Sequence, residues 1–198
     1  MIDVIAPLWL AALQEIIDRG AHEVKDSLNG VSLNLEVIRS RSEKPATTGK
    51  DISGFAAAAS GQLETLSARV ESMLVLARPA RTATSPDVAL TMKQLATLLV
   101  PTAKADGKVL QVDGYDRTAP SKAPPVAVRL ALASGMLALM QQKGGRCTLE
   151  SGREPVVRFS HESAAACTLD PAVADALAGC NIRTRRSDPD LLIVFPGP

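Results

Sequence analysis

Aromatic side chains are scarce in this sequence: they make up 3% of its 198 residues, with one Trp, one Tyr and three Phe. So few rings argue against a surface on which the bases of single-stranded nucleic acid stack. An excess of charge is lacking too, because 22 Lys and Arg are balanced by 21 Asp and Glu, for a formal net charge of +1. A protein that neutralises a phosphate backbone needs a basic surplus. We therefore expect no nucleic-acid partner.

Cysteines are few and odd in number. The three, Cys147, Cys167 and Cys180, have no zinc-binding spacing, and an odd count fits a reducing compartment better than a secreted disulfide framework. The apolar stretch at the start carries Asp3, lacks a positively charged segment and ends at Gln14. Such a stretch is typical of neither a signal peptide nor a membrane span. We expect a cytoplasmic protein with no membrane partner.

The apolar pattern that is present predicts a long helical hairpin. Between residues 8 and 40, apolar or small residues recur every three or four positions, which is the period of one helical face. They are Leu13, Ile17, Gly20, Val24, Leu28, Val31, Leu35 and Ile38. Polar residues with Pro45 and Gly49 predict a loop over 40–50, and a second helical pattern covers 51–77. Two long helices joined by a short loop form an antiparallel hairpin.

This hairpin cannot bury its apolar stripe alone. A second copy would close a four-helix bundle, which predicts a homodimer through residues 8–77. The alternative is that the stripe packs against the C-terminal half of its own chain. Gly20 and Gly30 each cost such a helix about 1 kcal/mol relative to Ala. They predict a close approach or a bend.

The second half of the chain predicts a different architecture. A linker with two prolines covers 78–86, and five strand patterns alternate with three helical ones beyond it. The helical patterns cover about 87–105, 125–142 and 170–179. We expect an α+β fold, with the hairpin over residues 1–80 followed by a small α/β sandwich over 86–198.

Histidine occurs twice, as His22 and His161. His22 falls off the apolar stripe, and the side chains nearest to it on a helix are polar. They are Asp18, Lys25, Asp26 and Asn29. We expect a solvent-facing imidazole, for which a surface position without a role is the simplest interpretation, although histidine also suits phosphoryl transfer near neutral pH. His161 ends a strand pattern without a ligand partner at suitable spacing, which predicts a structural role.

The segment HEVKDSLNGVSLNLEVI, residues 22–38, resembles the H-box of the dimerisation and phosphotransfer domain of sensor histidine kinases, H-E-x-x-(T/N)-P-L-x-x-I. His22 matches the phosphoryl-accepting histidine, and Glu23 matches the carboxylate that orients the imidazole in that family. Leu28 and Val31 match the apolar pair behind it. The resemblance extends over about residues 8–80 and implies that this hairpin is a histidine phosphotransfer domain.

Two positions depart from the H-box pattern. Asp26 stands where the family has Thr or Asn, so the neutral side chain that positions water for phosphatase activity is missing. Ser27 stands where the family has Pro, which implies a weaker bend of the helix.

The second half resembles the ATP-binding domain of the same kinases in the order of its elements, but not in its motifs. The helix similar to the one that carries a metal-binding Asn offers Ser134 and Ala138 instead. HESAAACTLDPAV (161–173) replaces the D-x-G-x-G turn and the glycine-rich lid. A nucleotide site needs a metal ligand and backbone N–H groups facing phosphates. We therefore expect a degenerate domain with no ATP and no other cofactor.

Together these features resemble stand-alone histidine phosphotransferases of the ChpT type. The resemblance implies a phosphotransferase without autokinase activity that relays a phosphoryl group between receiver-domain aspartates of a two-component phosphorelay through His22. Its expected partners are response-regulator receiver domains, which bring their own Mg²⁺, and a hybrid histidine kinase. By helical position, the expected docking face contains Lys25, Asp26, Asn29 and Leu33. The basic run Arg183, Arg185 and Arg186 is either a solvated face or part of a docking surface.

Two alternatives remain open. A non-catalytic kinase-like regulator would sequester a histidine kinase or a response regulator, and His22 would then be dispensable. An active kinase with a divergent nucleotide site would bind ATP.

Overall fold

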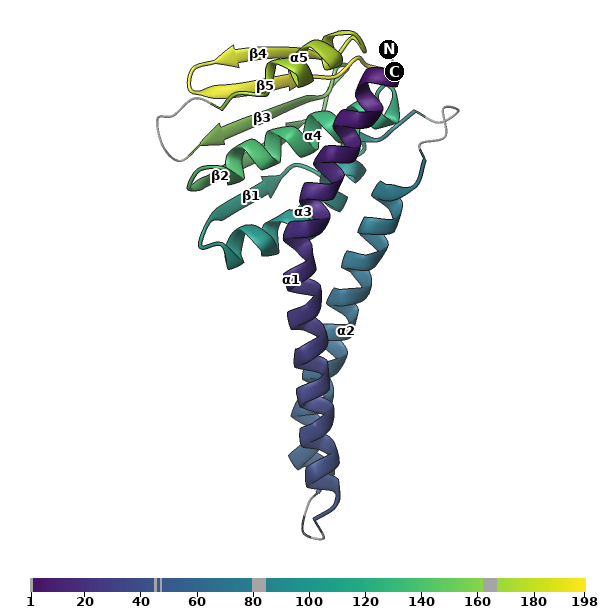
Figure 1. Cartoon of the computed structure of the whole chain (residues 1–198), viewed down its shortest axis with the longest axis vertical. Helices are drawn as coiled ribbons and strands as arrows, with labels where there is room; N and C mark the ends of the chain where they lie inside the picture. Colours follow the sequence, from purple (N-terminus) through teal and green to yellow (C-terminus); the bar gives the residue numbers. More distant parts are fainter. Residues whose placement is uncertain (1, 45, 47, 80–84, 162–166) are drawn as a thin grey trace.

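The computed structural model describes residues 2–44, 46, 48–79, 85–161 and 167–198. Two long antiparallel helices, α1 (Ile2–Ser42) and α2 (Gly49–Ala77), extend away from an α/β half of the molecule, as Figure 1 shows. The Asp51 carboxylate accepts hydrogen bonds from the backbone N–H and the hydroxyl of Thr48, both at 2.8 Å. These bonds start α2 and lower the pKa of Asp51. The predicted hairpin is confirmed.

Helix α1 begins at Ile2, six residues before the predicted start, and includes Pro7. The reason is burial: its first turns place Ile5 and Trp9 in the same hydrophobic core as the C-terminal half. Burying a large apolar side chain contributes about 1.5–3 kcal/mol, which offsets the backbone hydrogen bond that Pro7 cannot make. The first part of α1 therefore packs against the C-terminal half of its own chain, which was the alternative to a dimer interface.

The residues of the predicted apolar stripe differ in their burial in the structure. Leu13 lies in the common core, whereas Gly20 and Val31 are buried farther along the hairpin. Ile17, Leu28 and Leu35 stay exposed. The two glycines mark close approaches to α2. A Cβ on Gly20 would lie 3.1 Å from the Met73 methyl group, and one on Gly30 would overlap the Gln62 amide.

The described residues of the C-terminal half form three helices and one five-stranded sheet, so the α+β fold class is as predicted. The helices are α3 (Val88–Ala105), α4 (Pro125–Met140) and α5 (Pro171–Ala178). The strands are β1 (Val109–Asp113), β2 (Gly144–Glu150), β3 (Val156–His161), β4 (Arg183–Ser187) and β5 (Asp190–Val194). Their order is β1-β2-β3-β5-β4, and only β1 and β2 pair in parallel, as α4 crosses between them.

Part of the hydrophobic core lies between α4 and the sheet. Cys147, Phe159 and Ile193 are fully buried on strands β2, β3 and β5. Gly135 leaves room for the Phe159 ring, because a Cβ there would overlap it. Helix α1 crosses this half in contact with α3, α4 and α5 (Figure 1). No helix in the described ranges combines the length and hydropathy that a bilayer crossing requires.

Candidate functional site

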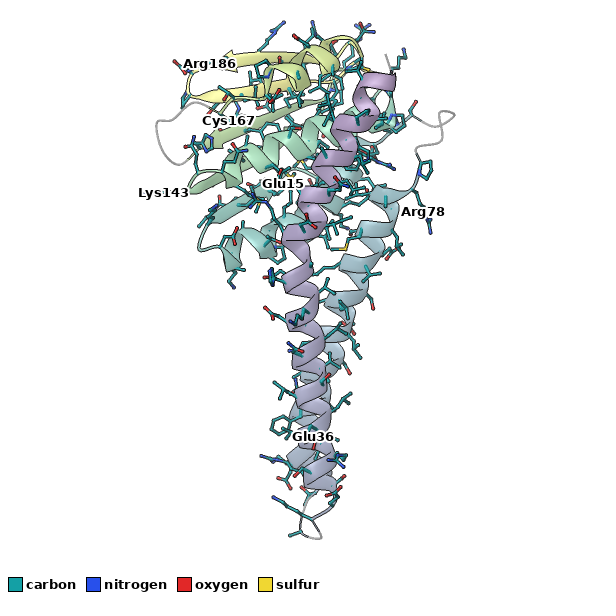
Figure 2. All side chains as sticks on the ribbon, in the orientation of Figure 1. Glu15, Glu36, Arg78, Lys143, Cys167 and Arg186 are labelled. Atoms are coloured by element: carbon teal, nitrogen blue, oxygen red, sulfur yellow. The ribbon has the colours of Figure 1, made fainter. Side chains whose placement is uncertain are left out.

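His22 lies on α1 just beyond the part of the helix that packs on the α/β half. Figure 2 labels Glu15 at the level of that half and Glu36 near the hairpin tip, and His22 falls between them in sequence. Its side chain is exposed, as predicted, and makes no hydrogen bond within the described part of the chain. The polar neighbours Asp18 and Lys25 are exposed too. The imidazole is therefore accessible to a partner molecule.

A shallow groove of about 590 Å³ runs from His22 towards the end of α3. Its lining includes Asp18, Arg19 and Asp106. Arg19 forms ion pairs with Glu15 at 2.9 Å and with Asp106 at 3.6 Å, so the wall of the groove links α1 to the α/β half. A protein that reaches His22 would contact both parts of the chain here.

Glu23 points to α2. Its carboxylate Oε2 lies 3.7 Å from Nη2 of Arg69, and its side chain is mostly buried. The Nη1 atom of Arg69 donates to the backbone carbonyl of Glu23 at 3.0 Å and to the Ser27 hydroxyl at 3.1 Å. Consecutive side chains on a helix face different directions. In this structure the carboxylate is therefore directed to Arg69 and not to the His22 imidazole.

Ser27 occupies the position where the H-box has proline, and α1 continues through it as one helix. Its hydroxyl donates to the Glu23 carbonyl at 2.8 Å, so that carbonyl accepts from Ser27 and from Arg69. Sequence reasoning missed Arg69, because one arginine among polar residues on a helix gives no signal of its partner. The only available hint was its position, three residues past the apolar Leu66 and one before Val70.

The expected docking residues lie along α1 from His22 towards the hairpin tip. Lys25, Asp26, Asn29 and Leu33 are all exposed. Leu33 is 68% exposed, which is the largest fraction among the exposed large apolar side chains of the described chain. They form a mixed strip of charged, polar and apolar side chains on the side of α1 that carries His22.

A second groove lies beside α4, the helix that resembles the metal-binding helix of the kinases. It has a volume of about 660 Å³ and is lined by Ser134 and Ala138 of α4, by the first turns of α1 and by the start of α5. Its ionisable lining residues are Glu15 and Asp170, and no Lys or Arg is among the described residues that line it. A groove without Lys or Arg offers phosphate groups no cation unless a metal ion intervenes. The replaced turn and lid fall partly outside the described residues.

The other candidates from the sequence have structural surroundings. His161 ends β3, and its Nδ1 lies 3.3 Å from the backbone oxygen of Gly144. In the basic run on β4, Arg183 pairs with Glu154, and Arg186 pairs with Asp188.

The cysteines are free and buried. Burial raises the pKa of the Cys147 thiol and raises that of Cys167 to about 11. Thiols in this state are poor nucleophiles and poor metal ligands at neutral pH. Within the described ranges, no group of three or more His, Cys, Asp or Glu side chains could hold a metal ion.

Comparison with known proteins gives matches among solved structures alone: no protein-family model and no curated sequence matches this chain. One similar structure is the Acinetobacter baumannii histidine kinase AdeS, at 12% identity, with 89% of this chain and 98% of that chain covered and a TM-score of 0.44. Another is the cytoplasmic segment of the histidine kinase QseC, at 10% identity, with 68% and 92% covered and a TM-score of 0.40. Likenesses of this size assign no role to any residue of this chain.

Proposed function

We propose that this chain is a histidine phosphotransferase that relays a phosphoryl group between receiver-domain aspartates of a two-component phosphorelay through His22, without binding ATP. The observation that carries the proposal is the position of His22: an exposed imidazole, inside the chain's single H-box pattern, on a hairpin helix. A phosphoryl carrier needs an accessible nitrogen and a surface that positions the donor. Both requirements are compatible with the described geometry.

The chemistry requires little of the carrier itself. A ring nitrogen of neutral His22 attacks the phosphorus of an aspartyl phosphate, the new N–P bond forms as the O–P bond breaks, and the aspartate leaves as a carboxylate. The reverse step delivers the group to a second receiver. The Mg²⁺ that neutralises the phosphoryl oxygens is expected on the receiver. Lys25, Asp26, Asn29 and Leu33 would contact the receiver beside His22.

The residues that line the second groove, beside Ser134 and Ala138, support a phosphotransfer that needs no bound nucleotide. A triphosphate placed between α1 and α4 would find no Lys or Arg among the described lining residues to bind its phosphates. The Glu15 carboxylate is paired with Arg19 outside the lining, and Asp170 caps α5. We therefore propose that residues 86–198 are a degenerate kinase-like domain that serves as a wall of the docking region.

A homodimer through the hairpin, within residues 1–80, is part of the same proposal. Several large apolar side chains of the hairpin remain exposed in the single chain: Ile17, Leu28, Leu35, Leu63, Val70 and Leu74. On α1, Leu28 and Leu35 are seven residues apart and share a face that is not the face carrying His22. A second hairpin would cover them and leave both histidines accessible.

The proposal is tested by incubating the chain with receiver domains that carry a radiolabelled aspartyl phosphate. We expect acid-labile label on this chain within minutes, and no label from Mg²⁺ and labelled ATP alone. Tight binding of a receiver without any uptake of label would contradict transfer and favour the sequestering regulator.

A further inference from the structure

Arg69 is the only charged residue that is buried in the described part of the chain, with 8% of its surface exposed. A guanidinium carries five N–H donors and loses its hydration on burial, so it needs acceptors from the protein. Its two hydrogen-bond acceptors and its ionic partner all belong to Glu23 and Ser27, within five residues of His22 along α1. The buried arginine of α2 therefore binds the segment of α1 that carries the histidine.

Apolar packing holds this segment of α1 only weakly. Beyond Gly20, Val31 is the only buried apolar residue in the described remainder of α1. The polar contacts of Arg69 lie between these two positions and fix the helix where His22 projects. Ser27 contributes because its hydroxyl accepts from Arg69 and donates to the same Glu23 carbonyl.

We infer that Arg69 is a positioning residue for His22, which acts by holding the backbone and the carboxylate of Glu23 so that the imidazole stands in a fixed place for in-line transfer. The inference rests on the proposed phosphotransfer and deepens it. Glu23 then serves through Arg69 and does not orient the imidazole directly. A misplacement of about 1 Å in a transfer step costs on the order of 10²-fold in rate.

The test measures the single-turnover rate of label uptake from a phosphorylated receiver, at saturating and at low receiver concentrations. Arg69→Met keeps the length of the side chain and removes its donors. We expect the rate at saturation to fall about 10- to 100-fold, while the receiver concentration that gives half the maximal rate changes less than about twofold. Arg69→Lys, which keeps the charge but not the fork of donors, restores part of the rate.

The matched control is Gln62→Met. Gln62 accepts a hydrogen bond from Asn34 at 3.2 Å, so it also joins α2 to α1, but nearer the hairpin tip. The Gln62→Met variant should take up label at a rate within about twofold of wild type. An equal loss in Gln62→Met and Arg69→Met would mean that loosening the hairpin anywhere slows transfer, and it would overturn a specific role for Arg69.

A double-mutant cycle separates the two roles of Glu23. If Glu23 acts through Arg69, Glu23→Gln and Arg69→Met each slow the step, and the double variant is no slower than the slower single one. If Glu23 acts directly on His22, the two losses multiply, which overturns the inference.

Folding is checked by circular dichroism. If Arg69→Met does not fold, the inference is tested with Arg69→Lys and Ser27→Ala instead. Unchanged rates of label uptake in both variants would overturn it. Wild type that takes up no label overturns the proposed function itself. Wild type that takes up label while Arg69→Met matches it overturns the role of Arg69 alone.

Discussion

Arg129 of α4 donates a hydrogen bond to the backbone carbonyl of Leu76 in the last turn of α2, at 3.1 Å. The same guanidinium donates to the carbonyls of Val75 at 3.2 Å and Arg78 at 2.8 Å. The last carbonyls of a helix have no partner within it, and a cation there also complements the helix dipole. One side chain from the α/β half therefore caps the hairpin helix that returns to it. Its partial burial lowers the pKa of Arg129.

We predict that Arg129→Met lowers the free energy of unfolding by about 2 kcal/mol, since hydrogen bonds from a charged group are lost at a half-buried site. Urea unfolding monitored by circular dichroism measures the change. Arg117→Met is the control, because Arg117 is exposed and such a change stays within about 0.5 kcal/mol. Equal stability of the two variants would contradict the capping role.

The second prediction concerns the exposed leucines of the hairpin. Light scattering at micromolar concentration should give the mass of two chains for the wild type, because this apolar surface is too extensive to leave in water. Leu63→Glu should shift the mass towards one chain, since it places a charge in the bundle interface. Leu33→Glu, on the side of His22, should leave the dimer intact. A wild-type monomer, or a dimer that survives Leu63→Glu, would count against the bundle.

The third prediction concerns the groove beside Ser134 and Ala138. Millimolar ATP with Mg²⁺ should leave the melting temperature unchanged, because no Lys or Arg is among the described residues that line the groove. Binding to the folded state alone would raise it by linkage. A rise of several degrees would revive the kinase alternative.

Much of the fold could be predicted from the sequence because local signals mark it. Asp87 and Asp170 accept hydrogen bonds from the backbone at the starts of α3 and α5, as capping residues do. Gly179 is the cap residue at the end of α5. Glycine commonly follows the end of a helix, yet Gly144 and Gly145 begin β2. Strand partners come from long-range packing, which no local pattern records.

The candidate site was predictable only in part. The exposure of His22 followed from its place off the apolar stripe, since helical period fixes which face a residue occupies. The direction of the Glu23 side chain could not be predicted. The resemblance implies that its carboxylate orients the His22 imidazole, whereas in the structure Glu23 contacts Arg69, 46 residues away. A contact of that sequence separation depends on how the two helices are aligned, which the pattern of either helix alone leaves open.

The most direct test of the central claim follows label from a phosphorylated receiver onto wild type, His22→Ala and His161→Ala. An exposed helix position changes stability by about 0.5 kcal/mol or less, so His22→Ala should keep its fold and its dimer. The account predicts that His22→Ala takes up no label, whereas His161→Ala labels as wild type does. Full uptake of label by His22→Ala would contradict it.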